Sequence, residues 1–240
     1  MKRLPFMLAF LASLLVIVAL LFTSLQLCMN DEGWYYRQYE KMNLSARIGI
    51  STADITEALM RLVDYMEGRV ESIQLVVTED GEAVEMYNER ETLHMLDVRA
   101  LYQAWRTVRD FGALAAAVLL LTALYLTEKG ARLRLVSRAF LWASAAFGAL
   151  LAALAIFALA DFGAFWVAFH HVFFDNDLWL LSYQTDRMIR ICPAELFSGI
   201  IARFALLFLI PFAALLALSF FGKRTPRKAA PAPEGNPDAL

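Results

Sequence analysis

The chain has 240 residues, of which 60% are hydrophobic, with a mean hydropathy of +0.52 and a formal net charge of −2. Soluble domains carry about 45–50% apolar residues, so this composition excludes an ordinary soluble protein. The two cysteines, Cys28 and Cys192, lie too far apart for metal-ligand spacing. We interpret both as structural, and a disulfide between them would require that both lie on an oxidising face.

Four apolar stretches account for most of this hydrophobicity, and a span of a bilayer needs about 20 such residues. The first stretch is too long for the apolar region of a signal peptide and no small-residue cleavage site follows it, so we predict an uncleaved helix. The second is short, but neighbouring apolar residues extend it toward the interface. The predicted transmembrane helices are residues 1–28, 112–127, 136–160 and 200–221.

The positive charges predict the orientation of these helices. Lys and Arg gather before the first helix, in the short connection 128–135 and in the tail 222–240. By the positive-inside rule, both termini and this connection lie in the cytoplasm, and segments 29–111 and 161–199 face outward. The protein is then a multi-pass membrane protein. The tail is polar and rich in proline, which predicts disorder.

The outer segment 29–111 is long enough to fold. Apolar residues recur at helical spacing from Ile55 to Met66 and stop at Gly68, which predicts an amphipathic helix. Residues 72–78 and 82–87 flank an Asp-Gly turn and predict a β-hairpin. Asn88 then has the position of a helix cap. The fold class expected is an all-α membrane protein with four transmembrane helices and a small α/β extracytoplasmic cap.

Candidate catalytic residues lie in both outer segments, which hold all three histidines of the chain. Glu91, His94 and Asp97 are spaced three apart, so they lie on neighbouring turns of one helix face. A carboxylate beside an imidazole fixes its tautomer and raises its basicity, as acid–base catalysis requires. The alternative is a solvated polar face. His170 and His171 follow the third span among aromatic residues, where an unpaired polar side chain is costly unless functional.

Two sequence patterns around these histidines resemble a known family. Residues 91–98 read E-x-x-H-M-x-D-V, and residues 169–179 read F-H-x-x-F-F-x-N-x-x-W. Asp186 and the sequence from Cys192 to Phe197 follow the second pattern. Together with the four-span layout, over residues 1–222, they resemble the lipoprotein intramolecular transacylases (Lit) of Gram-positive bacteria.

The resemblance implies an acyltransferase that makes lyso-form lipoproteins. Such an enzyme moves the sn-2 acyl chain of a diacylglyceryl lipoprotein to the α-amine of the lipoprotein's own N-terminal cysteine. The family's two catalytic histidines correspond to His94 and His170, with His171 as an alternate for the second. Supporting residues in the matched patterns are Glu91, Asp97, Asn176 and Trp179. The implied partners are the lipoprotein N-terminus and membrane lipid, with no nucleic acid, no metal and no cofactor.

Within this reading we expect His94 to be the acid–base shuttle, because Glu91 and Asp97 can polarise it, and His170 to be its partner near the ester. The reverse assignment stays open. His94 lies about eighteen residues, or roughly 27 Å of helix, before the second span. We therefore expect the helix over 88–110 to bend or lie along the membrane, so that the two imidazoles meet directly or through one water.

Two other functions remain open from the residues alone. A metal-dependent membrane hydrolase would use Glu91, His94, Asp97 and His170, although their spacing matches no zincin motif. A non-enzymatic envelope sensor or assembly factor would bind a partner through the outer cap.

Overall fold

The computed structural model describes residues 3–223, and the disorder predicted for the tail falls on residues outside this range beyond 223. Four of the described helices are long and apolar enough to cross a membrane. They are α1 (Arg3–Met29), α5 (Glu89–Tyr125), α6 (Arg132–Ala160) and α9 (Ala194–Lys223), with a short 3₁₀ turn, η1 (Lys129–Ala131), before α6. The predicted membrane protein with four spanning helices is confirmed.

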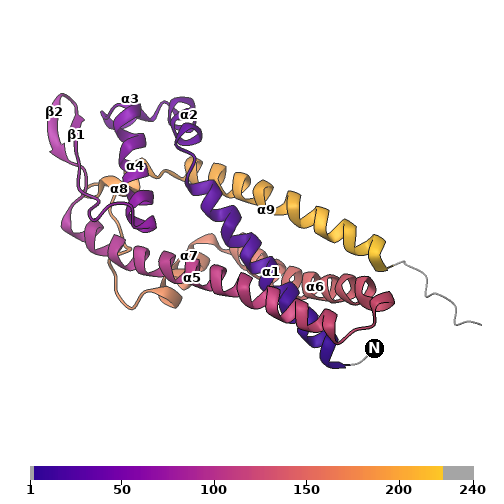
Figure 1. The fold of residues 1–240 in the computed structure, drawn as a ribbon. Coiled ribbons are helices and arrows are strands. Elements are labelled where there is room, and N and C mark those ends of the chain that lie inside the picture. Colours follow the sequence, from indigo (N-terminus) through magenta and orange to yellow (C-terminus); the bar gives the residue numbers. More distant parts are fainter. Residues whose placement is uncertain (1–2, 224–240) are drawn as a thin grey trace, which may run out of the picture.

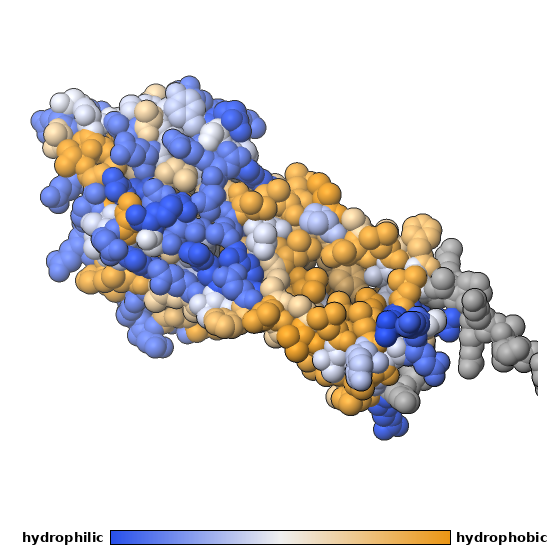
Figure 2. Space-filling model, in the orientation of Figure 1, coloured by the Kyte–Doolittle hydropathy of each residue, from blue (hydrophilic) through white to orange (hydrophobic). Residues whose placement is uncertain are grey.

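The four helices form an elongated bundle that carries the cap at one end (Figure 1). α1 packs against the other three, and α6 also packs against α9. The start of α1, the α5–α6 connection and the end of α9 lie together at the opposite end. Figure 2 shows the same division by hydropathy, with a hydrophilic cap and a mostly hydrophobic bundle. The apolar bundle surface needs lipid around it, because exposed apolar area on this scale is unfavourable in water.

The cap begins with three helices, α2 (Glu32–Met42), α3 (Leu44–Ile48) and α4 (Thr52–Glu67). The sequence predicted α4, whose apolar face is buried in the cap core, and its end at Gly68, which has a φ of 78°. Helices commonly end at a residue in this left-handed backbone conformation, and glycine adopts it without a steric penalty. The sequence analysis assigned no structure to α2 and α3.

The predicted hairpin forms, with shorter strands than expected: β1 (Val76–Glu79) pairs antiparallel with β2 (Glu82–Glu85). Asp80 and Gly81 form the turn, and both have positive φ, 51° and 90°. Two such residues make the tight turn whose twist suits a hairpin. The small α/β cap is therefore confirmed. The sequence left two further helices unassigned: α8 (Arg187–Ile191) packs into the cap core, and α7 (Phe162–Phe173) packs against α6.

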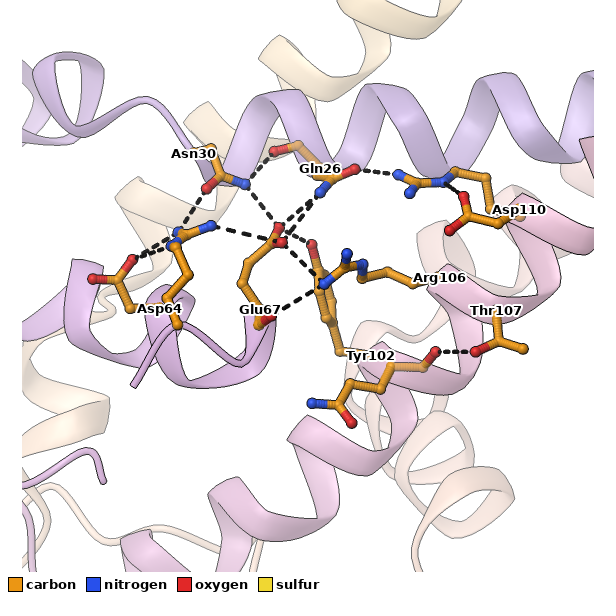
Figure 3. Close-up of polar contacts among 11 residues, drawn as sticks. Gln26, Asn30, Asp64, Glu67, Tyr102, Arg106, Thr107 and Asp110 are labelled. Carbon is orange, nitrogen blue, oxygen red and sulfur yellow. Dashed lines mark hydrogen bonds and ion pairs between the residues drawn. The ribbon is translucent and has the colours of Figure 1, made fainter. Parts of the chain in front are cut away.

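A buried carboxylate fastens the cap to the bundle (Figure 3). Glu67, at the end of α4, accepts hydrogen bonds from Gln26 of α1 at 2.9 Å and from Tyr102 of α5 at 2.5 Å. Arg106 of α5 pairs with the same carboxylate at 3.3 Å. These bonds hold the pKa of Glu67 below its usual value against the opposing effect of its burial. The end of the cap helix is thereby fixed against both membrane helices.

α5 carries the cap into the membrane without a break. Its first turn has a capping box, in which Asn88 accepts from the Glu91 N–H at 2.9 Å and the Glu91 carboxylate accepts from the Asn88 N–H at 2.8 Å. Its 37 residues correspond to roughly 55 Å, whereas the hydrocarbon core is about 30 Å thick. Because the apolar half is the C-terminal one, the first turns, including His94, protrude from the membrane.

Candidate active site

His94 lies in the second turn of α5, on the side that faces the connection after α7. Its ring meets the edge of Phe174, with a centroid distance of 5.5 Å. Its Nδ1 atom is buried and has no hydrogen-bond partner among residues 3–223. A buried polar atom without a partner is rare in folded proteins and often marks a place where a ligand binds.

His170 lies in the last turn of α7, whose first turn is capped by Asp161 accepting from the Ala164 N–H at 2.9 Å. The imidazole is only 5% exposed, and its Nδ1 lies 2.7 Å from the carbonyl oxygen of Trp166, one helical turn earlier. A carbonyl oxygen can only accept, so Nδ1 carries the proton and donates it. In the neutral ring the lone pair is then on Nε2, which makes Nε2 the basic atom.

The two histidines meet at Phe174. Its ring centroid is 5.5 Å from that of His94 and 5.7 Å from that of His170. Both imidazoles therefore contact the same phenyl ring, which is 7% exposed. A direct or water-bridged contact between them stays a prediction.

The segment from Phe173 to Asp177, at the end of α7 and just after it, brings about this meeting by lying against α5. Asn176 donates to the Asp97 carboxylate at 2.9 Å and so fixes this segment to the helix face that carries His94. Three further contacts join the same segment to α5: Phe173 with Trp105, Phe174 with His94, and the Asp177 carbonyl with Arg90. α5 is one continuous helix from Glu89 to Tyr125. Whether its first part bends or lies along the membrane surface stays a prediction.

Two tryptophan rings pack against His170. Trp179 stacks on it with a centroid distance of 4.5 Å and an interplanar angle of 25°, and Trp166 lies at 4.5 Å on a tilted plane. His171 is exposed and meets Trp179 edge-on at 5.6 Å. Of the two adjacent histidines, only His170 is buried against Phe174.

Glu91 serves the fold rather than His94. One of its oxygens completes the capping box, and the other accepts from the Met188 N–H of α8 at 2.5 Å. Burial raises the pKa of this carboxyl, and the two backbone donors act in the opposite direction. Glu91 was predicted to polarise His94, but it makes no hydrogen bond to His94 among the described residues, because both of its oxygens accept from backbone N–H groups. Asp97 influences His94 only through its charge.

Burial lowers the pKa of His94 to about 4, and His170 acts in the same direction, whereas Asp97 opposes it. His94 is therefore neutral at physiological pH in the folded protein. An unfolded histidine has a pKa of about 6.5, so between pH 6.5 and 4 the unfolded chain binds the additional proton.

Stability should therefore fall as the pH is lowered through this window, and His94→Gln should remove up to about 3 kcal/mol of that loss. The measurement is the melting temperature of both proteins in detergent from pH 7.5 to 4.5. Parallel curves for the two proteins would contradict the lowered pKa.

The sequence did not reveal two parts of this site: the Trp166 carbonyl that anchors His170, and Phe174 as the ring shared by both histidines. The i, i+4 spacing of Trp166 and His170 would have indicated the first, had α7 been predicted as a helix. Cys28 and Cys192 are free thiols rather than a disulfide.

Comparison with known protein families confirms the resemblance seen in the sequence. The family model described as "Lipoprotein intramolecular transacylase Lit" matches residues 10–197, more than three quarters of the chain. The chain belongs to the Lit family. Comparison with curated proteins gave no match.

The fold is also that of a Lit structure. The membrane-integral Lit from Bacillus cereus superposes with a TM-score of 0.71 at 16% identity, covering 92% of this chain and 97% of that one. Two variants of the B. cereus protein, with one histidine replaced by arginine or by alanine, match with TM-scores of 0.68 at 16% and 17% identity. These matches cover 92% and 91% of this chain, and 91% and 92% of the respective variant.

Lit membership makes the protein an acyltransferase embedded in the membrane. The sequence alone had left a sensor and a metal-dependent hydrolase open. The family assignment favours the transacylase over both.

Proposed function

We propose that the enzyme transfers the sn-2 acyl chain of a diacylglyceryl lipoprotein to the α-amine of the same lipoprotein's N-terminal cysteine, using His94 and His170. The observation that carries this proposal is the anchored Nδ1–H of His170, which leaves Nε2 as a base beside a second, neutral imidazole. The family assignment supports the substrate class.

The reaction needs a proton to leave the attacking amine and a proton to reach the departing glyceryl oxygen. The amine nitrogen bonds to the ester carbonyl carbon, and the bond from that carbon to the sn-2 oxygen then breaks. Nε2 of His170 takes the proton from the amine and returns it to the sn-2 oxygen, so the products are an amide and a free hydroxyl. Because one molecule supplies both ends, no other acyl acceptor is required.

This assignment reverses the roles expected from the sequence. A base is most effective when its pKa is near the working pH, and the low pKa of His94 makes it a weak base. Neutral His94 is better suited to orient the amine or the ester by hydrogen bonding through its unpartnered Nδ1. His170, with its orientation held by the Trp166 carbonyl, is the better shuttle.

We also propose that the termini are cytoplasmic and the histidines face outward. The support is the basic residues at the end of the bundle far from the cap, which the positive-inside rule assigns to the cytoplasm.

The test is expression in a bacterial host whose lipoproteins carry a diacylglyceryl group and a free N-terminal amine. Mass spectrometry of a lipoprotein's N-terminal peptide should reveal the N-acyl, monoacylglyceryl form at unchanged total mass, because an acyl chain moves within one molecule. Fragment ions distinguish the two isomers. An unchanged fragment pattern despite membrane expression would contradict the proposal, and cells expressing a His170→Ala variant are the control.

A further inference from the structure

The indole N–H of Trp179 is a hydrogen-bond donor that the fold leaves without an acceptor. The side chain is 8% exposed, and its Nε1 atom is buried with no partner within the described part of the chain. An indole N–H can only donate, so no internal rearrangement of protons can satisfy it. Buried tryptophans usually find an acceptor, and an orphaned N–H calls for an explanation.

This donor lies beside the proposed base. The indole stacks on His170, and His170 in turn neighbours Phe174 and, through it, His94. Among the described residues, buried side-chain polar atoms without a partner include both Trp179 Nε1 and His94 Nδ1, which come from different elements and converge on this site.

The segment that carries Trp179 is tightly fixed. The Leu178 N–H donates to the Asn176 side-chain oxygen at 3.0 Å, and the Leu181 N–H donates to the Trp179 carbonyl at 3.0 Å. Asn176 is itself bonded to Asp97 on α5. A donor whose position is set before the reaction begins needs no reorganisation when charge develops in front of it.

We propose that the Trp179 indole N–H stabilises the oxyanion formed during acyl transfer, as a catalytic residue distinct from the two histidines. This inference rests on the proposed function. When the amine attacks, the carbonyl π electrons move to oxygen, and the resulting negative oxygen accepts from Nε1–H. When the carbonyl re-forms, the bond to the sn-2 oxygen breaks and His170 supplies the proton. Trp179 keeps its own proton throughout.

The hydrogen-bonding pattern around His170 favours this donor. Its Nδ1–H is already given to the Trp166 carbonyl, and its Nε2 is occupied with the proton that moves. The oxyanion therefore needs a donor from another side chain, and the stacked indole provides one whose hydrogen does not take part in the proton transfer.

The alternative is that Trp179 only lines the site and holds His170 in place by stacking on it. Replacement of Trp179 by 3-benzothienylalanine separates the two roles, because sulfur replaces the N–H while the ring size and the stacking surface are retained. Trp179→Phe is the genetically simple companion. Leu180, which is exposed in the same segment, gives the control Leu180→Ala.

Two measurements are made on each full-length protein in detergent. In turnover with a diacylglyceryl lipopeptide, we expect kcat to fall about 100- to 1000-fold in the benzothienyl variant, with KM and the melting temperature unchanged. The second measurement compares the affinities for two unreactive lipopeptides. One carries a phosphonate at the sn-2 position, which mimics the tetrahedral intermediate, and the other keeps the ester but has an acetylated amine that cannot attack it. The wild type should bind the phosphonate more tightly, and the variant should lose that preference while binding the ester equally well.

A benzothienyl variant with wild-type kcat, or one that keeps the phosphonate preference, would overturn the oxyanion role. So would a wild type that binds the phosphonate no better than the ester. Because binding needs no turnover, it tests the donor even if the wild type fails to convert the lipopeptide, a result that would count against the proposed function instead.

Discussion

Replacing His170 with alanine should reduce acyl transfer by about 100- to 10,000-fold, the range that a positioned acid–base group contributes. The reason is that His170 donates its Nδ1–H to a carbonyl and is buried among aromatic rings, which leaves Nε2 for the proton transfer. His94→Ala should be similarly damaging, because it removes the second imidazole that contacts Phe174 and its unpartnered Nδ1. Conversion of a diacylglyceryl lipopeptide, followed by mass spectrometry, measures both effects.

The neighbouring His171 provides the matched control. It is exposed and contacts only the edge of Trp179 among the ring contacts of the described residues, so His171→Ala should retain most of the activity. If His171→Ala were inactive and His170→Ala active, the assignment would be wrong by one residue.

Replacing Glu91 with alanine should lower the free energy of unfolding by about 3 kcal/mol or more. The carboxylate is 1% exposed and accepts from two backbone N–H groups, those of Asn88 and Met188. Each buried donor left without an acceptor costs about 1–3 kcal/mol. Thermal or denaturant unfolding in detergent measures the loss.

Glu89→Ala is the control for Glu91, because Glu89 has the same charge in the same helical turn but is exposed. We expect only a few tenths to about 1 kcal/mol from the lost interaction with the helix dipole. Should Glu91→Ala keep its melting temperature and lose only kcat, the carboxylate would act on His94 directly, as the sequence had suggested.

Short-range signals in the sequence predicted several features correctly. The lengths of the apolar stretches predicted four spanning helices, because a bilayer leaves a chain few ways to satisfy its backbone polar groups. Asn88 followed by Glu91 predicted the start of α5, and Gly68 predicted the end of α4. These features depend on backbone geometry and on residues within one turn of one another, so the local sequence is sufficient to reveal them.

The role of Glu91 shows where this reasoning fails. Its spacing from His94 suggested a catalytic pair, but its second oxygen binds the Met188 N–H, which lies 97 positions further along the chain. Which group satisfies a buried carboxylate depends on which elements pack around it, and no periodicity within α5 carries that information.

The sequence by itself thus determined the membrane architecture, the small cap and the two histidines as candidates. Only the tertiary structure decided how those histidines meet: the segment after α7 lies against α5, Phe174 contacts both imidazoles, and the Trp166 carbonyl fixes the His170 tautomer. The physical reason is that hydrophobic length and helix capping act over a few neighbouring residues. The protonation and orientation of a buried imidazole are instead set by partners that the folded chain brings from distant positions.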